Sequence, residues 1–533
     1  MQQGVIEVAT TGLLRKYSSM TATMFRVPGP IGQPTLARVL DGAFTVIEEA
    51  VLAVDTAYLD TFDWRLFNRS ASLLYSGDTL TLALLNTDKK KVQVIGGQRP
   101  VFAWDLPSGA IRKQVAGALE MRALLVRAQT HTLTTAYRVL NDNDETICQL
   151  AVDAISHGLD GDAVGIFVRL LPARGYDREL AEIGHRLTET GATELAAGEL
   201  FDVVMQATGQ QPGGYQPKPV VPLDPAMHAD KALKALLRAE LEVIQINEPY
   251  ISQDIDTEFL HDYRVALRRT RSALAEMKGV FSARTTKQLR VDLQVANQFS
   301  NELRDLDVYI LSEDRFRSLL PGQLRDGIAP LFDHLRGRRA VALASLIEAL
   351  ESPVYRRTMA DLTRFLDEPV AADAAAPAGK LPVLQVANRR IYKQYRQVLK
   401  AGRTITVESP DEMLHALRIQ CKRLRYLMEL FAGLYASREI TGLIKQLRTL
   451  QGMLGDFNDL SVQEAYLMRT ATEMAGSGQT PPDTLMAIGA LVSAMDAERT
   501  VVRASFGDTF KAFAARDNRQ RFKLAFDGRG TKL

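Results

Sequence analysis

The stretch HDYRVALRRTR at residues 261–271 recurs 154 residues later as HALRIQCKRLR at residues 415–425. Each copy opens on a histidine and continues with basic residues at every third or fourth position. The same offset relates RDLDV at 304–308 to NDLSV at 458–462 without a gap. Two motifs that share one spacing predict a duplicated structural unit. We expect its two copies to pack about a pseudo-twofold axis.

On a helix, the basic residues of each copy fall in one narrow stripe beside an apolar strip. The first row consists of His261, Arg264, Arg268 and Arg271, and the second row consists of His415, Arg418, Lys422 and Arg425. Arg269 and Arg423 point elsewhere. Bringing the two rows together costs repulsion unless a polyanion neutralises them. The pattern therefore indicates a ligand that is rich in phosphate.

Arginine suits phosphate because its planar guanidinium presents a fork of donors and stays charged. We add the nearby basic residues to the candidate ligand contacts: Arg304, Arg389, Arg390, Lys393 and Arg396. Asp305 and Asp459 are candidates for orienting the arginines. The alternative is that these helix faces are solvated surfaces or form intramolecular salt bridges, as most single basic helices do.

The bulk composition bounds the class of protein. A chain of 533 residues with 46% hydrophobic residues predicts two to four globular domains. No apolar run approaches the roughly 18 residues that span a bilayer, and the start, MQQGVIEVAT, has no signal-peptide pattern. We therefore expect a cytoplasmic protein without a membrane partner. Cys148 and Cys421 show no metal-ligand spacing, and we expect buried thiols, no metal and no cofactor.

Two regions of different pattern flank a Gly-, Pro- and Gln-rich linker at 206–225. Residues 1–205 predict an α+β domain with an antiparallel β-sheet or barrel. Its expected strands are 79–85, 92–95, 132–140, 147–155 and 163–171, and its expected helices are 112–129 and 177–190. Net charge differs as well, because the basic excess lies after the linker.

Residues 226–515 predict an all-helical domain with halves 226–367 and 384–515. The expected helices are 228–248, 258–280, 286–311, 325–350, 384–400, 411–435, 439–472 and 483–512. An Ala/Pro-rich break at 368–382 separates the halves. The tail, 516–533, is expected to be frayed.

The helical region resembles the CHAD family over about 228–515. HDYRVALRRTRSAL, ELRDLDV, LHALRIQCKRLRYLMELF and LQGMLGDFNDLSV carry the resemblance, in order and in both halves. The resemblance implies two helical bundles related by pseudo-twofold symmetry, with the basic rows lining a central groove or pore. It also implies that the domain binds inorganic polyphosphate, which could target the protein to polyphosphate granules.

The N-terminal region is similar to CYTH domains, the triphosphate tunnel family, at the stretch YLDTFDWRL, 58–66. The catalytic pattern of that family does not follow, because Glu7 stands alone in IEVATTGL and the expected basic and acidic strands read LLY, TLAL and GIFVR. We therefore expect a degenerate, non-catalytic domain that serves docking or assembly with a protein partner. Arg138, Asp153 and Arg169 are expected at exposed positions of half-buried strands.

Two other functions remain open. The N-terminal domain could be a metal-dependent triphosphate or polyphosphate hydrolase, although the carboxylates that hold Mg²⁺ or Mn²⁺ are largely missing. The basic rows could bind nucleic acid, but Tyr263 and Tyr426 lie on or near the apolar face and not among the arginines, where bases would stack. No residue is identified as a catalytic nucleophile or general base.

Overall fold

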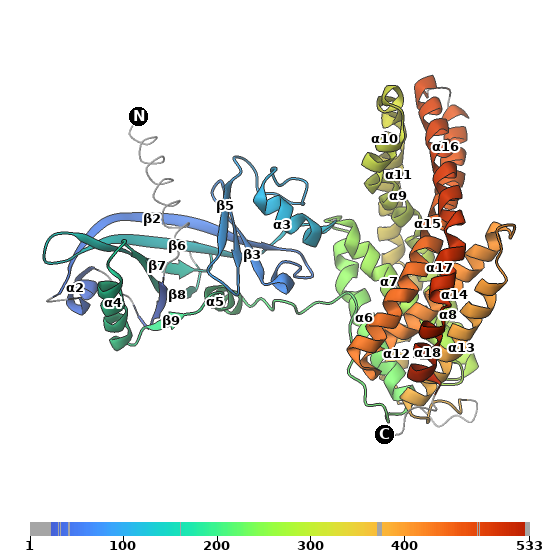
Figure 1. The fold of residues 1–533 in the computed structure, drawn as a ribbon, viewed down its shortest axis with the longest axis horizontal. Coiled ribbons are helices and arrows are strands. Elements are labelled where there is room, and N and C mark those ends of the chain that lie inside the picture. Colours follow the sequence, from blue (N-terminus) through green and yellow to red (C-terminus); the bar gives the residue numbers. More distant parts are fainter. Residues whose placement is uncertain are drawn as a thin grey trace. The chain divides into compact units, whose positions relative to one another are not determined.

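The computed structural model describes residues 23–29, 31, 33–40, 43–159, 161–369, 376–476, 478 and 480–527. The chain divides into two compact units, Met1–Gln216 and Pro217–Leu533 (Figure 1). The boundary between them falls inside the predicted linker, 206–225. The start MQQGVIEVAT and Glu7 lie outside the described residues.

The first unit is built on one antiparallel sheet with the strand order β5-β4-β3-β2-β6-β7-β8-β1-β9. Its strands are β1 (Thr23–Val27), β2 (Thr45–Asp60), β3 (Ala71–Ser76), β4 (Thr79–Leu84), β5 (Lys90–Val94), β6 (Leu125–Leu140), β7 (Thr146–Ser156), β8 (Ala163–Pro172) and β9 (Thr193–Leu195). The long strands β2 and β6 pair along most of their length (Figure 1). Within the described parts of this unit, no ladder joins β5 to β9, so closure into a barrel stays a prediction.

The five expected strands correspond to β4 through β8. The sequence pattern did not predict β1, β2, β3 and β9. The helix that it predicted at 112–129 runs past the end of the real helix and into β6. That helix is α3 (Ala110–Leu119), and the other expected helix is α4 (Asp177–Glu189). Strand β2 was missed because its acidic residues, such as Glu48 and Glu49, interrupt the alternation of polar and apolar residues.

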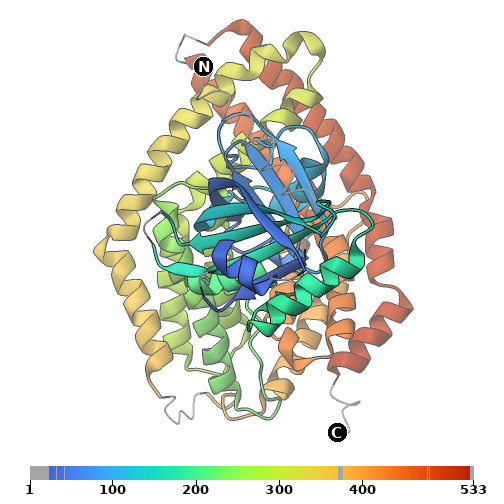
Figure 2. The same ribbon diagram turned by 90° about the vertical axis from the view of Figure 1, so that its left-hand side faces the viewer.

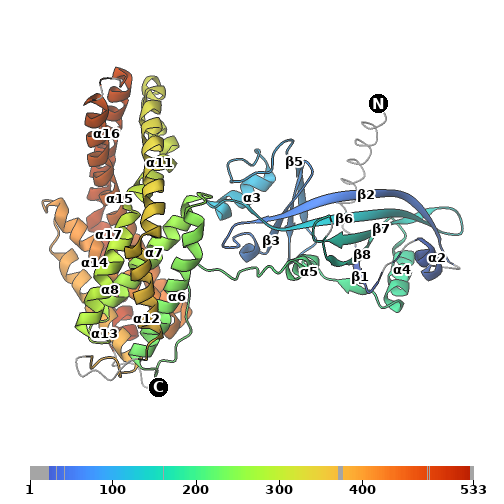
Figure 3. The ribbon, with the colours of Figure 1, turned by 180° about the vertical axis from the view of Figure 1, so that it is seen from behind.

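Three apolar clusters hold helices against this sheet. Leu36 of α2 (Gln33–Val39) and Ile183 of α4 join one cluster, near one end of the sheet (Figure 3). Ile111 of α3 packs against β3 and β4 in the second cluster. Phe201 of α5 (Glu199–Ala207) packs with Tyr58 and Trp64 in the third cluster.

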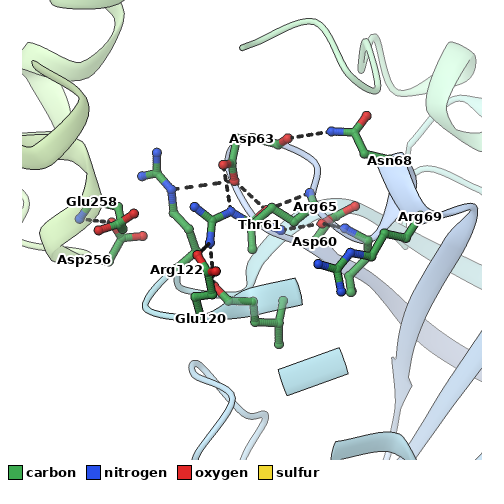
Figure 4. Close-up of polar contacts among 12 residues, drawn as sticks. Asp60, Thr61, Asp63, Arg65, Asn68, Arg69, Glu120, Arg122, Asp256 and Glu258 are labelled. Carbon is green, nitrogen blue, oxygen red and sulfur yellow. Dashed lines mark hydrogen bonds and ion pairs between the residues drawn. The ribbon is translucent and has the colours of Figure 1, made fainter. Parts of the chain in front are cut away.

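The YLDTFDWRL stretch shapes the turn that follows β2 (Figure 4). The Asp60 carboxylate accepts backbone N–H bonds from Thr61 at 2.7 Å, Leu66 at 2.9 Å and Phe67 at 2.8 Å. Burial raises the pKa of Asp60 to about 6, against the effect of these bonds. Asp63 accepts from the Arg65 Nε at 2.8 Å. These carboxylates therefore support the turn and are largely occupied by it.

The second unit is entirely helical among its described residues. Its α-helices are α6 (Ala229–Ile251), α7 (Thr257–Glu276), α8 (Ala283–Phe299), α9 (Asn301–Leu311), α10 (Glu313–Leu319), α11 (Ala329–Glu351), α12 (Pro353–Asp367), α13 (Val383–Arg403), α14 (Asp411–Leu430), α15 (Ser437–Gly476), α16 (Pro482–Ala504), α17 (Phe506–Phe513) and α18 (Arg516–Phe526). Figure 2 shows α11 in yellow and α16 in red as long outer helices of this unit. None of the helices in the described chain is both long and apolar enough to cross a membrane.

The helix bounds repeat at the offset read from the sequence. Adding 154 to the first and last residue numbers of α7 gives the bounds of α14, and adding 154 to the first residue number of α6 gives the first residue of α13. With the same offset, α8 and α9 both fall within α15. The bounds of α11 then differ from those of α16 by one residue. The duplication predicted from two short motifs therefore extends over most of the helical unit.

The two copies differ at several places that the sequence pattern did not predict. The helix expected at 286–311 is interrupted at Ser300, whereas α15 continues through the equivalent position. Helix α12 was missed. The tail expected to be frayed contains α18, whose Phe522 and Phe526 are buried.

Candidate functional site

The two basic rows lie on helices α7 and α14, which pack against each other. Helix α7 is nearly surrounded by protein, because α6, α8, α9 and α14 all contact it. Asp256 caps its first turn by accepting the Glu258 N–H at 2.9 Å. The arrangement places the first row at helix contacts and not on an open surface.

Arg264 of the first row is buried and bonded to neutral groups. Its Nη1 donates to Ser300 Oγ at 2.6 Å, and its Nη2 donates to Asn301 Oδ1 at 3.0 Å. Burial, followed by the charge of Arg268, lowers the pKa of Arg264 to about 10. Its acceptors come from the break between α8 and α9, where helix-terminal groups lack intrahelical partners. Arg264 is therefore a fixed cation whose donors are already engaged.

The second row is held by α15 through different partners. The His415 Nδ1 lies 2.5 Å from Asn458 Oδ1, and the Arg418 Nη2 donates to Asp459 Oδ1 at 2.9 Å. Asp459 thus orients Arg418, as the sequence suggested. In the first copy, Asp305 acts on Arg264 only through its charge. The difference follows from the continuous helix α15, which offers side chains where the first copy offers a helix end.

Arg268 and Lys422 occupy equivalent positions in the two copies, and the charge of Arg268 acts on Lys422 across the helix pair. Burial, followed by the charges of Arg418 and Arg268, lowers the pKa of Lys422 to about 8, and the charge of Asp459 opposes this shift. Neither Arg268 nor Lys422 forms an ion pair with any described residue. The Nε atoms of Arg268, Arg418 and Arg425 are buried and lack a hydrogen-bond partner within the described chain. This group of cations is the part of the rows with the most unused donors.

The outer members of the rows are more weakly engaged. Arg271 donates to Gln294 Oε1 at 3.3 Å, and burial lowers its pKa, with a further contribution from Arg290. The Arg425 guanidinium lies 5.4 Å from the ring centre of Tyr426. Arg304 reaches the Thr257 carbonyl at 3.5 Å, and burial lowers its pKa. His261 is half-buried at the start of the first row.

Arg269 and Arg423 point away from the rows, as expected, and connect helices. The Arg269 guanidinium is buried between Glu240 of α6, at 3.0 Å, and Glu429 of α14, at 3.5 Å. Burial raises the pKa of Glu240 to about 7 despite that pair. Arg423 of α14 approaches Glu276 at the end of α7, at 3.7 Å. These contacts fasten α7 to α14 without using the rows.

The candidate residues of α13 do not join the rows as a group. The Arg390 guanidinium donates to the Lys278 carbonyl beyond the end of α7, so this residue lies near the helix pair. Arg389, Lys393 and Arg396 are exposed. Positions 389, 393 and 396 therefore lie apart from the rows, on the outer face of α13 opposite its apolar side, and their contact with a phosphate-rich ligand stays a prediction.

The structure adds residues that the basic pattern could not reveal. Ser300, Asn301 and Asn458 provide acceptors for row residues, and Arg290 adds a charge beside Arg271. Asn458 could have been found from its place in the repeated motif. The serine and asparagine at the break carry no charge pattern, so only the fold identifies them.

The polar candidates of the first unit are not exposed as a group. Asp153 is buried, and it accepts from Thr134 Oγ1 at 2.6 Å and from Arg169 Nη2 at 2.9 Å. Arg138 pairs with Glu49 at 3.0 Å. The expectation of exposed strand positions is therefore wrong for Asp153. In the part of the chain that the structure describes, no group of three or more His, Cys, Asp or Glu residues is arranged to hold a metal ion.

The second unit is thus a duplicated helical domain in which two basic rows meet. Residues 235–468 match the family model of the CHAD domain. The chain is similar to two Mycobacterium tuberculosis proteins, "Uncharacterized protein MT2285" (strain CDC 1551 / Oshkosh) and "Uncharacterized protein Rv2226" (strain ATCC 25618 / H37Rv). Each is 26% identical to this chain over 308 residues, which are 56% of this chain and 55% of the relative. The chain therefore spans about half the length of the curated relatives it matches.

Two solved structures are also similar to the chain. The CHAD domain from the plant Ricinus communis matches with a TM-score of 0.43 and 24% identity, over 58% of this chain and 96% of that one. PptA from Streptomyces chartreusis matches with a TM-score of 0.39 and 18% identity, over 54% of this chain and 100% of that one.

Replacing Arg264 tests its role as a fixed, structural cation. We expect Arg264→Met to lower the free energy of unfolding by about 1–3 kcal/mol, because Ser300 and Asn301 lose a buried charged donor. Urea denaturation followed by circular dichroism measures the change. An unchanged or higher free energy of unfolding would contradict the assignment.

Replacing Lys422 is expected to change the free energy of unfolding in the opposite direction, by raising it. Its pKa in the folded chain, about 8, is lower than its ordinary value, so the charged form costs stability below about pH 8. Lys422→Met should therefore raise the free energy of unfolding by about 1–2 kcal/mol at pH 7, after allowance for solvent screening. The gain should shrink as pH rises from about 8 to about 10, where the unfolded chain also loses its proton.

Urea titrations at pH 7 and pH 10 measure this difference. Lys400→Met on the exposed face of α13 is the matched control and should change stability little at either pH. Destabilisation by Lys422→Met at pH 7 would show that the lysine is a stabilising contact and not a crowded cation.

Proposed function

We propose that the helical unit binds inorganic polyphosphate where α7 and α14 meet. The observation that carries the proposal is the packing of α7 against α14, which brings Arg268 and Arg418 within range to act on Lys422 through their charges. Asp459 is the acidic group that opposes them at Lys422, and it is already paired with Arg418. Several cations beside one carboxylate favour an anionic ligand, since the ligand replaces repulsion by attraction. The CHAD family is associated with polyphosphate binding, which agrees with this charge argument.

The row residues would have different roles in ligand binding. Arg268, Lys422 and Arg425 have unused donors and would contact phosphate oxygens directly. Arg264 and Arg418 are held by Ser300, Asn301 and Asp459, so they would contribute a fixed positive field. His261, His415, Arg271 and Arg304 would extend the contact along the chain of phosphates. A polyanion would also favour the charged form of Lys422, so binding would be accompanied by proton uptake near pH 8.

The duplicated helices support a symmetric binding groove. Each of α6 and α7 contacts its own equivalent, α13 and α14 respectively. A pseudo-twofold axis passing between Arg268 and Lys422 would account for both contacts. A repeating ligand such as polyphosphate would present the same phosphate geometry to each copy.

Polyphosphate fits the rows better than nucleic acid does. Proteins that bind single strands place aromatic rings where bases can stack. Tyr263 is fully buried at 0% exposure, and Tyr426 is half-buried beneath the Arg425 guanidinium. The cations would therefore meet phosphate without a platform for bases. Through polyphosphate the protein would be brought to polyphosphate granules.

Charge reversal at the centre tests this proposal. Arg268→Glu together with Lys422→Glu should weaken polyphosphate binding by about 100-fold or more, because two phosphate contacts become two repulsions. Isothermal titration calorimetry of the full chain at several salt concentrations measures the affinity. The wild-type logarithm of affinity should fall linearly with the logarithm of salt concentration.

The control reverses two exposed charges elsewhere in the unit, Lys231→Glu on α6 and Arg357→Glu on α12. Circular dichroism checks that both variants keep their helices. Equal affinities of the central variant and the control would remove the proposal, and tighter binding of DNA than of polyphosphate at one ionic strength would replace it.

For the first unit we propose a non-catalytic role in docking a protein partner. Asp153, a carboxylate on the face of the sheet that it shares with Arg169 and Thr134, already bonds to both. Asp60 and Asp63 likewise bond to the turn after β2. These three carboxylates are therefore engaged within the unit.

Incubating the full chain with tripolyphosphate and Mg²⁺ or Mn²⁺ tests this role. We expect no phosphate release above that of a buffer control, because metal-assisted hydrolysis needs free carboxylates. Metal-dependent release that disappears in Asp153→Asn would favour the hydrolase instead.

A further inference from the structure

A second set of cations lies on the outer face of α13. The outer stripe consists of Arg389, Lys393, Arg396, Lys400 and Arg403, which are all exposed. Their alternating spacing of four and three residues aligns them on one side of the helix over about 21 Å. No residue of Val383–Arg403 is acidic, and none of the stripe forms an ion pair with a described residue.

The outer stripe belongs to the second copy alone. The equivalent positions of α6 are Ala235, Ala239, Glu242, Ile246 and Pro249. The duplicated framework therefore does not require these cations, since α6 forms the same helix without them. Their presence on α13 needs an explanation separate from that of the two rows.

The outer stripe faces away from the rows. Helix α13 contacts α14 through Gln394, whose Nε2 donates to the Gln420 carbonyl at 3.2 Å. Gln420 and Lys422 are two residues apart, which places their side chains on nearly opposite sides of α14. The apolar side of α13, with Ile391 and Val398, is buried, and the stripe lies opposite to it. Two layers of helix thus separate the stripe from Lys422.

Helix α18 widens this basic surface. It packs on α13 through Phe522, which stacks on Tyr395 with ring centres 3.8 Å apart. Arg519 of α18 and Arg403 of the stripe both act on the Tyr395 hydroxyl through their charges, so both lie near that ring pair. Arg516 precedes Arg519 and Lys523 follows it at helical spacing, and both are exposed.

We propose that the outer stripe and Arg519 form a second track for the polyphosphate chain that the rows bind, so that long chains engage both. This inference rests on the proposed function. Unpaired cations in a line are complementary to a linear polyanion. Linking two contacts through one chain raises affinity through the effective concentration of the second contact.

Other anionic partners fit the outer stripe less well. A helix that binds membranes exposes apolar side chains beside its cations, whereas the apolar residues of α13, such as Val386 and Leu399, are buried. Tyr392 is half-buried against Tyr395, with ring centres 6.3 Å apart, and so offers no open platform for bases. A flexible chain of phosphates needs neither feature.

The test compares a short and a long ligand on the full chain. The outer variant carries Lys393→Glu, Arg396→Glu and Lys400→Glu, and the matched control carries Lys231→Glu, Arg357→Glu and Arg438→Glu, which are exposed elsewhere. With tripolyphosphate, which is too short to reach both tracks, we expect affinity within about twofold of wild type. With long-chain polyphosphate we expect the outer variant to bind at least about tenfold more weakly, and with a shallower salt dependence.

Three results would overturn the second track. The first is an unchanged affinity of the outer variant for long-chain polyphosphate. The second is an equal loss of affinity of the outer variant for both ligands. The third is a loss of affinity for long chains in the control variant that equals the loss in the outer variant. Loss of DNA binding without loss of long-chain polyphosphate binding would assign the surface to nucleic acid. The neutral variant Lys393→Gln, Arg396→Gln, Lys400→Gln replaces the outer variant if circular dichroism shows that it has unfolded.

The outcome also separates this inference from the proposed function. If the variant Arg268→Glu, Lys422→Glu keeps its affinity for tripolyphosphate, the rows are not the binding site and the proposed function fails. If that variant loses its affinity for tripolyphosphate while the outer variant binds long-chain polyphosphate with wild-type affinity, only the second track fails.

Discussion

The packing of α7 against α14 half-buries two cations of equivalent position, Arg268 and Lys422, within range of each other's charge. Burial and the neighbouring positive charges are both unfavourable to a cation, and together they lower the pKa of Lys422. It persists because other interactions fasten the same two helices. Arg269 lies buried between Glu240 and Glu429, so opposite charges hold the interface together beside the place where like charges meet. The repulsion thus lies among the side chains of the two rows, apart from the ion pairs that fasten the helices.

The two copies of the duplicated unit stabilise their arginines in different ways. In the first copy a break at Ser300 presents uncharged acceptors to Arg264, whereas in the second copy the unbroken helix α15 presents Asp459 to Arg418. An uncharged acceptor leaves the field of the arginine intact, and a carboxylate neutralises much of it. Asp305 also acts on Arg264 through its charge, but it forms no hydrogen bond to Arg264, so the two arginines are held in different geometries. A polyanion lying across both rows would meet an asymmetric surface despite the shared framework.

The sequence predicted what depends on periodicity and could not predict what depends on a single local contact. The repeated motif located α7 and α14, because basic and apolar residues at helical spacing determine both the helix and its orientation. The break at Ser300 was missed because apolar residues keep their spacing on both sides of it. Helix α18 was missed because its sequence is mostly polar and the residue on which its Phe522 packs, Tyr395, lies far away in the sequence. The cations of α13 were grouped with the rows by nearness in sequence, and only the packing of α13 on α14 separates the two sets.

Duplication explains which features of the helical unit can differ between its halves. Helices α6 and α7 contact their own counterparts, α13 and α14, so a residue at these contacts packs against the other copy, and the basic residues of the rows recur in both copies. The outer face of α13 contacts no counterpart, and its cations have replaced the apolar, small and acidic residues found on α6. A charge there adds little repulsion across the interface, because helix layers and solvent screen it. The outer face of one copy can therefore acquire a new ligand contact while the central rows keep the constraint of packing against each other.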